Sequence, residues 1–334
     1  MRLDDDLVEA MGLELSLVKS VLVTGATGVI GRSLISLMKE LRLLGRFTGS
    51  IIAVSNSRTL SDLDSARGDQ SFRGDLVDRK FVSSLPDADV VIHAASPSAP
   101  SQFMARPVET VLLNVDATLG LRSKAIRNFV FISTSEIYSG LNHPATEDEV
   151  GRTNTVHPRA SYIESKRVGE VLTLTSNGKN MQNPKCTVFR VALAYGHEGV
   201  EINDSRLLYD LVRRAVLEGH LTFSGDGSMV RTYSFAPDIA ILLLTTAFLG
   251  DEGIYNLGSS DTRTLLQIAE AVAFEVDVPL RQSSAKFESA PGAPQVVRMD
   301  TTKISSMFPR FEFTSLEVGL KQVVAIFRNA LQKN

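Results

Sequence analysis

The sequence predicts an α/β fold, a doubly wound parallel sheet with a smaller C-terminal region. Segments of strand and helix character alternate from Ser20 onward. Several strand segments, such as 89–92, are continuous apolar runs, which suits a parallel sheet covered on both faces. Gly25, Gly28 and Gly31 follow the first strand at a spacing that allows a sharp turn into a helix. These features together predict that helices flank the sheet.

Six strands and their connecting helices are expected between residues 20 and 195, and residues 1–19 are interpreted as an N-terminal extension. The strands are predicted at 20–24, 50–55, 71–73, 88–93, 128–132 and 187–191, and the helices at 29–43, from Pro107 and from Ser161. The helix from Pro107 carries apolar residues at helical spacing, so we expect it to bury one face. These residues are Val108, Val111, Leu112, Val115 and Leu119.

The region 196–334 differs in pattern and is interpreted as mainly binding the substrate, with some segments returning to the sheet. A helix is expected at 204–218 and a glycine-rich turn at 225–227. Thr314 and Glu317 match a capping box, which predicts the start of a last helix. Its inward stripe comprises Leu316, Leu320, Val323, Phe327 and Leu331.

Composition and charge argue against several classes of partner. The chain has 334 residues, 43% of them hydrophobic, and a formal charge of −3, so it can bury a large core and has no basic field for nucleic acid. No apolar run is long enough to span a membrane, and Asp4 to Asp6 stand where a secretory signal would be basic. Cys186 is the only cysteine, and the five histidines are scattered. We therefore expect a cytoplasmic protein without a metal cluster.

The stretch from Val21 to Gly31 is predicted to cradle phosphate. A helix that begins after Gly28 directs its free N–H groups and its positive dipole end toward the preceding loop. This arrangement is typical of a dinucleotide site, although an ordinary tight turn between strand and helix would contain the same glycines. The cofactor-binding residues expected here are Gly25, Thr27, Gly28, Val29, Ile30 and Gly31.

Tyr162 and Lys166 are four residues apart and should project from one face of a helix. A neighbouring ammonium and a nicotinamide cation both favour the phenolate, so we expect Tyr162 to have a lowered pKa and to accept the proton of an alcohol. Thr134 ends the preceding strand, where its hydroxyl can hydrogen-bond the same oxygen. A pair on a helix surface would show the same spacing, but its position after the fifth strand favours catalysis. Thr134, Tyr162 and Lys166 are therefore candidate catalytic residues, the last two also beside the cofactor.

A series of further motifs follows in a fixed order along the chain. They are Gly74-Asp75-Leu76, His93-Ala94-Ala95, Asn114, Gly225-Asp226-Gly227, Arg231, Tyr233, Asp238 and Asn256-Leu257-Gly258. With these motifs the chain resembles the extended short-chain dehydrogenases/reductases of the NAD(P)-dependent nucleotide-sugar epimerase/dehydratase type, over about residues 20 to 330. The resemblance implies a Rossmann-type sheet and a grip of Arg231 on a nucleotide diphosphate. It also implies cofactor contacts from Asp75, Leu76, Ala94 and Ala95.

Within this family, the segments 93–97, 133–138 and 158–162 are most similar to UDP-glucuronate decarboxylases, and the triplet 134–136 also resembles GDP-mannose 4,6-dehydratases. The resemblance implies oxidation of the sugar at C4. Glu136, a fourth candidate catalytic residue, would then handle a proton at C5 or C6 during decarboxylation, dehydration or epimerisation. Leu193 and Val297 stand where the family has Asn and Arg. Substrate contacts are expected from Ser96, Ser135, Glu136, Arg231 and Arg298.

Other functions stay open at this point. An NADPH-dependent 4-ketosugar reductase or a plain 4-epimerase needs only the tyrosine and the threonine, and a dinucleotide-sensing regulator keeps the fold without catalysis. The cofactor is NADP or NAD. Asn56 and Arg58 occupy positions where NAD-specific members have a carboxylate, and Arg58 can pair with a 2′-phosphate, which slightly favours NADP. The resemblance also implies a homodimer, in which the helices beginning at Pro107 and Tyr162 pair with their symmetry mates.

Overall fold

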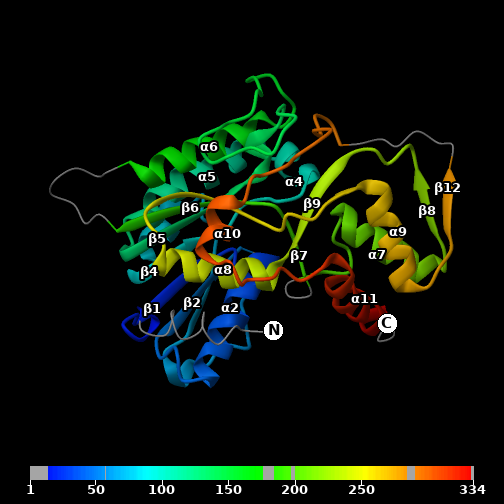
Figure 1. The fold of residues 1–334 in the computed structure, drawn as a ribbon. Helices are drawn as coiled ribbons and strands as arrows, with labels where there is room; N and C mark the ends of the chain where they lie inside the picture. Colours follow the sequence, from blue (N-terminus) through cyan, green and yellow to red (C-terminus); the bar gives the residue numbers. More distant parts are fainter. Residues whose placement is uncertain (1–13, 57, 176–183, 197–199, 284–289, 332–334) are drawn as a thin grey trace.

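A seven-stranded parallel sheet forms the centre of the protein, with the strand order β10-β6-β5-β4-β1-β2-β3 (Figure 1). The structure is a computed structural model and describes residues 14–56, 58–175, 184–196, 200–283 and 290–331. The strands of this sheet are β1 (Ser20–Thr24), β2 (Ser50–Ser55), β3 (Gln70–Arg73), β4 (Ala88–His93), β5 (Ala125–Thr134), β6 (Lys185–Val191) and β10 (Gly253–Leu257). The predicted α/β fold with a doubly wound parallel sheet is confirmed.

The six strands expected between residues 20 and 195 are present as β1 to β6, and β10 adds a seventh strand from the C-terminal part of the chain. It pairs in parallel with β6, with Ile254 opposite Val188. β10 has five residues and only its last three are buried, so it lacks the long apolar run that marks an inner strand. The sheet is thus completed by a strand that lies in the second half of the sequence, well after β6.

Helices cover both faces of the sheet. On one face α2 (Val29–Leu43) packs against α8 (Ala236–Leu249), and both contribute to a buried cluster with strand residues such as Ile92. On the other face α5 (Pro107–Arg122) packs against α6 (Ala160–Leu174). Figure 1 shows these two pairs on opposite sides of the strands. The shorter elements of this domain are η1 (Ser65–Arg67), α3 (Arg79–Ser84), α4 (Pro100–Ala105) and η2 (Ser135–Tyr138).

A second group of elements forms its own apolar core beside the sheet domain, on the right in Figure 1. Its helices pack together around side chains such as Val212, Ile268 and Val323. The first helix begins at Leu207, later than the predicted residue 204. The elements are β7 (Leu193–Tyr195), α7 (Leu207–Glu218), β8 (Leu221–Ser224), β9 (Val230–Phe235), β11 (Thr262–Thr264), α9 (Leu265–Val276), β12 (Leu280–Ser283) and α11 (Leu316–Leu331). The helix α10 (Thr302–Met307) belongs instead to the sheet domain, where it contacts β10 and buries Ile304 in the core.

The start of α11 differs from the predicted capping box. Thr314 is engaged elsewhere, because its backbone N and its Oγ1 bond the Asp238 carboxylate at 2.6 and 3.1 Å. Ser315 takes the capping position instead, and its Oγ accepts the N–H of Val318 at 3.4 Å. Glu317 pairs with an arginine of β11. The predicted apolar stripe of this helix is confirmed for its four buried members, Leu316, Leu320, Val323 and Phe327.

The expectation that α5 buries its apolar stripe is wrong within the single chain. Val108 is 66% exposed and Leu119 is 48% exposed. The helix instead turns the face with Asn114 and Leu121 toward α6 and the sheet. Val171 on the neighbouring α6 is also 63% exposed. The two helices therefore present apolar side chains to the outside.

The expected N-terminal extension is described only from Glu14 onward, since residues 1–13 lie outside the described part of the chain. Leu15 and Val18 are buried in the cluster formed by α2 and α8. These two residues are thus part of the main core. None of the helices in the described ranges is long and apolar enough to cross a membrane.

Candidate active site

The glycine loop between β1 and α2 allows a very close approach of two backbones. Gly25 has a φ of +66°, and a Cβ at this residue would lie 2.7 Å from the carbonyl oxygen of Ala94. A Cβ at Gly31 would collide with the carbonyl oxygen of Gly25. Gly28 is the N-cap of α2. The loop is therefore shaped for backbone contact with an anionic group at the helix N-terminus, as a dinucleotide pyrophosphate requires.

The end of β4 is fixed by a histidine to the end of β1, just before the glycine loop. Thr24 Oγ1 bonds His93 Nδ1 at 2.8 Å and accepts the N–H of Ala95 at 3.2 Å. The other ring nitrogen of His93 lies 3.2 Å from the carbonyl oxygen of Leu113. Burial, with the Lys166 charge, lowers the pKa of this histidine to about 3, so the ring is neutral and donates to that carbonyl. Its role is to hold the loop that follows β4.

One cavity of about 560 Å³ runs from the glycine loop to the C-terminal region. This volume is in the usual range for a small-molecule or cofactor site. All four residues predicted for catalysis and several of those predicted for binding line this one cavity. They are Gly25, Gly28, Val29, Ile30, Gly31, Ala94, Ser96, Thr134, Glu136, Tyr162, Lys166 and Arg231.

The other residues predicted to bind the cofactor do not line this cavity. Asn56 is exposed, and the Arg58 guanidinium lies 3.4 Å from a carboxylate oxygen of Glu201. Asp75 Oδ1 accepts the N–H of a residue in its own turn at 2.9 Å. Leu76 is buried in the apolar cluster between the sheet and α5, together with Leu121. Thr27 is half-buried in the glycine loop, and Ala95 donates its N–H to the threonine that ends β1.

Tyr162 lies at the start of α6, stacked on the ring of Phe103 with centroids 4.5 Å apart. Its pKa is raised, because burial disfavours the phenolate and the Glu136 carboxylate repels it. Hydrogen bonding to Thr134 and the charge of Arg159 act in the opposite direction. The expected lowering of this pKa is therefore wrong for the arrangement seen here. The spacing of Tyr162 and Lys166 in the sequence reports neither the burial of the phenol nor the nearby Glu136 carboxylate.

Lys166 follows one turn later on α6. Its ammonium donates to the carbonyl oxygen of Ile132 at 2.7 Å and lies 4.8 Å from the centroid of the Phe131 ring. Burial lowers the pKa of Lys166 to about 7, and the Glu170 carboxylate acts against this shift. A buried amine that titrates near neutral pH is typical of a functional site.

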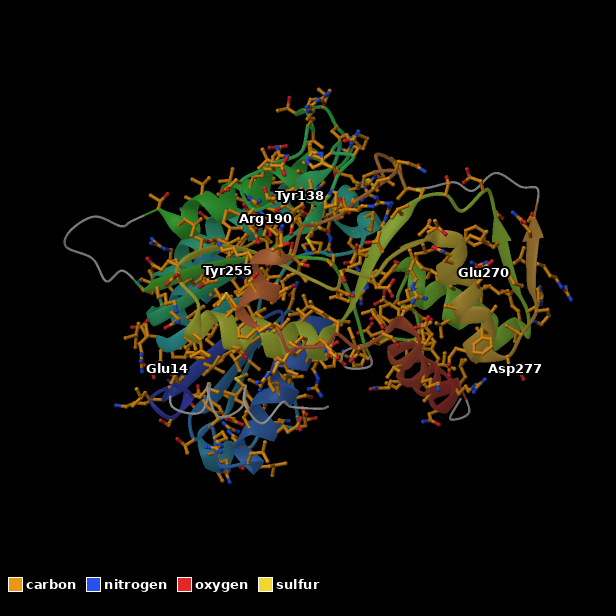
Figure 2. The ribbon with its side chains drawn as sticks, viewed as in Figure 1. Glu14, Tyr138, Arg190, Tyr255, Glu270 and Asp277 are labelled. Atoms are coloured by element: carbon orange, nitrogen blue, oxygen red, sulfur yellow. The ribbon has the colours of Figure 1, made fainter. Side chains whose placement is uncertain are left out.

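The turn that carries Glu136 rests on a buried polar network. Figure 2 shows Tyr138 and Arg190 side by side, and Arg190 donates to the tyrosine oxygen at 2.8 Å. The tyrosine donates in turn to Asn256 Oδ1 at 2.6 Å. Arg190 also pairs with Glu170 at 2.8 Å, which accepts a bond from Ser133. Because every charge in this network has a partner, the 3₁₀ turn η2 is held rigidly at the end of β5.

Arg159 belongs to the site, although the sequence prediction did not include it as a site residue. Its Nη1 donates to Glu136 Oε1 at 2.5 Å, and its Nε donates to the carbonyl oxygen of Pro291 at 3.1 Å. The side chains of this ion pair are 5% and 15% exposed. The available signal was a cation three residues before Tyr162, at the start of the same helix. A guanidinium buried there needs a carboxylate partner.

Arg231 on β9 brings a positive charge to the wall of the cavity. Its Nη1 donates to the carbonyl oxygens of Val230 and Gln295 at 2.7 and 3.4 Å, and no described carboxylate lies within ion-pair distance. Burial lowers its pKa. Arg206 also lines the cavity but is paired with Asp204 at 2.5 Å. Arg231 is therefore the better candidate to bind an anionic group such as a diphosphate.

Three polar atoms of cavity residues are buried and have no hydrogen-bond partner in the described part of the chain, Ser96 Oγ, Glu136 Oε2 and Tyr195 Oη. An unpaired buried polar atom costs about 1–3 kcal/mol. Hydroxyl groups of a ligand can satisfy Ser96 Oγ and Glu136 Oε2. Within the described ranges no cluster of three histidine, cysteine or acidic side chains is suited to hold a metal ion.

A second, smaller cavity of about 20 Å³ adjoins Ser135 and Glu136. Leu193 and Val297, the two residues that depart from the family pattern, both line it. The space is enough for one small group. Arg298 is exposed and lines neither cavity, so the structure does not bring it to the other candidate site residues.

The chain is similar in sequence and in fold to known proteins. A sequence model of the NAD dependent epimerase/dehydratase family matches residues 21–258. UDP-glucuronic acid decarboxylase 2 of Arabidopsis thaliana is 30% identical over 316 residues, which cover 92% of this chain and 68% of that protein. The solved structure of MoeE5 in complex with UDP-glucose and NAD has a TM-score of 0.75 and 25% identity, and the match covers 93% of this chain and 99% of that one. MoeE5 in complex with UDP-glucuronic acid and NAD gives the same values.

Proposed function

Because the chain belongs to the NAD-dependent epimerase/dehydratase family, we propose that it oxidises a nucleotide sugar at C4 and then decarboxylates, dehydrates or epimerises the 4-keto intermediate. The observation that carries this proposal is the shared cavity. It is lined by the glycine loop, by Thr134, Tyr162 and Lys166, and by Arg231. A dinucleotide cradle, an alcohol-handling group and a cation for the diphosphate thus meet in one site.

NAD is the cofactor of this family, and the glycine loop fits it. The backbone approach at Gly25 and the helix N-terminus after Gly28 suit a pyrophosphate, with Val29, Ile30 and Gly31 in the first turn. When bound, the nicotinamide supplies reversible hydride uptake. The preference for NADP through Arg58 stays a prediction. So do the cofactor contacts of Thr27, Asn56, Asp75, Leu76 and Ala95, which lie outside the cavity wall.

In the proposed reaction Tyr162 accepts the proton of the C4 hydroxyl, and Thr134 hydrogen-bonds the same oxygen. The raised pKa of Tyr162 means that its phenol ionises only when cations oppose the burial. The ammonium of Lys166, one turn along the same helix, supplies one such charge in its protonated form. The pair of Tyr162 and Lys166 therefore acts as one acid–base unit.

The fate of the 4-keto intermediate depends on Glu136 in this proposal. Its carboxylate lines both cavities and is placed to move a proton at C5 or C6 of the sugar. Ser96 and Ser135 are proposed to hydrogen-bond the sugar, and Arg231 to bind the diphosphate. The proposed substrate contact of Arg298 has no support from either cavity.

The test is product analysis by mass spectrometry. The purified protein with NAD is incubated with a panel of UDP-, GDP-, CDP- and dTDP-sugars, without added reductant. Loss of carbon dioxide, loss of water, or an isomer of unchanged mass would identify the second step. A strict need for stoichiometric NADPH would make the protein a 4-ketosugar reductase. Cofactor binding with no sugar chemistry on the whole panel would refute the proposal and favour a sensing role.

We also propose that the protein is a homodimer. The outward apolar side chains of α5 and α6 form one surface, which includes Val108 and Leu119 on α5 and Val168 and Val171 on α6. Contiguous apolar surface on paired helices is typical of an interface, and two copies related by a two-fold axis would cover it with four helices. Light scattering at micromolar concentration measures the mass, and a monomer would exclude this assembly.

We further propose that the protein acts in the cytoplasm. Cys186 is a free, buried thiol whose pKa is raised by burial, so it has the properties of a structural residue in a reducing compartment. Immunodetection after cell fractionation tests this placement, and recovery in an oxidising compartment would contradict it.

A further inference from the structure

The guanidinium of Arg159 is enclosed by three parts of the chain that lie far apart in sequence. It donates to Glu136 Oε1 at 2.5 Å and to the carbonyl oxygen of Pro291 at 3.1 Å. It also lies over the ring of Phe103, 5.8 Å from the centroid. The arginine side chain is only 5% exposed. Because the planar guanidinium is held by the Pro291 carbonyl oxygen and the Phe103 ring, it fixes the position of the carboxylate to which it is bonded.

Phe103 connects this ion pair to the tyrosine of the site. Its ring stacks on Tyr162 with centroids 4.5 Å apart and an angle of 6° between the planes. The two charges of the ion pair act on the phenol in opposite directions. The Glu136 carboxylate raises the pKa of Tyr162, and the Arg159 guanidinium lowers it. Without the arginine, the carboxylate and the phenol would oppose each other's ionisation.

The other charged or titratable groups around this site have different partners. The Lys166 ammonium, on the same helix as Tyr162, is bonded to a backbone carbonyl. Arg231 on β9 is influenced by the charges of both Glu136 and Arg159 but makes its bonds to backbone carbonyls. The ring of His157 accepts the backbone N–H of Arg159 at 3.2 Å. In the described ranges, Arg159 is thus the cation in direct contact with Glu136.

We propose that Arg159 is a positioning residue that holds the Glu136 carboxylate in place beside the sugar and offsets its charge at Tyr162. A base for the later proton transfer and a phenol for the alcohol can then work in one cavity. The kinetic part of this proposal rests on the proposed function. Its electrostatic part concerns the ion pair alone and is tested on the protein without substrate.

The kinetic test measures nicotinamide reduction after mixing with the active nucleotide sugar, as a function of pH. Arg159→Met should lower the rate of nicotinamide reduction at neutral pH by about 10²-fold. It should also move the rising limb of the rate-against-pH profile to higher pH by about one unit or more, because the Glu136 carboxylate then opposes the phenolate without a guanidinium to offset it. Adding Glu136→Gln to this variant should return the profile to that of Glu136→Gln. A profile unmoved in Arg159→Met, or unrestored in the double variant, would overturn the proposal.

Matched arginine variants separate charge from packing. Arg159→Lys keeps the charge but loses the second hydrogen bond and the flat contact with Phe103, so it should restore part of the rate. Arg167 also lies on α6 and donates to the carbonyl oxygens of Ile137 and Gly151, without contact to Glu136. Arg167→Met should lower stability without moving the pH profile. A shift as large as that of Arg159→Met would assign the effect to helix packing and contradict the proposal.

A stability test requires no activity. Urea unfolding is followed for the wild type, Arg159→Met, Glu136→Gln and the double variant at about pH 5 and about pH 8. An unpaired buried carboxylate is costly unless it takes up a proton, so Arg159→Met should lose more stability at the higher pH, and Glu136→Gln should cancel this difference. A loss independent of pH would refute the electrostatic part. If these four proteins show the expected pH dependence of stability while no sugar is oxidised, the proposed function fails and the ion-pair assignment stands.

Discussion

Replacing Lys166 by methionine should change how the stability of the protein depends on pH. The ammonium is buried, bonded to the carbonyl oxygen of Ile132 at 2.7 Å, and burial lowers its pKa from 10.5 to about 7. Methionine is a flexible apolar side chain that can fill the same space without a charge. The substitution therefore removes one buried titrating group and leaves the packing largely unchanged.

The sign of the effect follows from the two pKa values of Lys166. Below about pH 7 the amine is protonated in both the folded and the unfolded protein, and the folded state bears the full cost of the buried charge. Between about pH 7 and 10.5 the folded protein releases the proton while the unfolded chain retains it, so the free energy of unfolding rises with pH. The slope is at most about 1.4 kcal/mol per unit, which gives roughly 1–2 kcal/mol between about pH 7 and 8.5.

Urea unfolding followed by far-UV circular dichroism measures this difference at a series of pH values. We expect Lys166→Met to be more stable than the wild type at about pH 6.5, with a gap that shrinks by roughly 1–2 kcal/mol by about pH 8.5. Lys303 is a matched control, because it also donates to a backbone carbonyl at 2.7 Å and lies over the Tyr255 ring, but it is exposed. The free energy of unfolding of Lys303→Met should change with pH in the same way as that of the wild type. Parallel curves for Lys166→Met as well would refute the reasoning.

The remaining predictions concern the reaction, the cofactor and the assembly. Tyr162→Phe should abolish nicotinamide reduction, whereas Glu136→Gln should keep the absorbance rise and slow product formation by roughly two to four orders of magnitude; an unchanged product rate would make this carboxylate structural. Arg58→Ala should weaken NADP binding in calorimetric titration and spare NAD, and equal effects on both would remove the preference for NADP. Val171→Asp should yield monomers in light scattering, while Phe274→Asp, at an exposed apolar position on α9, should leave the dimer intact.

The parts of the site that the sequence predicted well are those specified by neighbouring residues. The turn at Gly25 needs a positive φ, and the contact at Gly31 needs a missing side chain, so the glycine spacing carries the shape of the loop. Tyr162 and Lys166 share a helix face because of the helical repeat alone. The strands before these motifs are short apolar runs, which are recognised in the same local way.

The features that the sequence did not reveal depend on contacts between distant segments. Arg159 bonds the carbonyl oxygen of Pro291, a residue far along the chain, and no local pattern reports that contact. The raised pKa of Tyr162 arises from burial and from the Glu136 carboxylate on another element. For α5, the apolar repeat showed which residues avoid water, but it could not show whether the same chain or a second copy covers Val108.

The position of α8 and β10 in the second half of the sequence affects how the protein folds during synthesis. Synthesis proceeds from the N-terminus, yet the sheet that carries the glycine loop is completed only by residues 236–257, and α8 is buried along most of its length. A nascent chain ending near residue 195 would expose to solvent the apolar surface against which α8 packs. It would also leave the edge of β6 unpaired, because β10 would be missing. The part of the chain up to residue 195 should therefore fold only after most of the second half has left the ribosome. A fragment ending there is expected to aggregate rather than bind NAD.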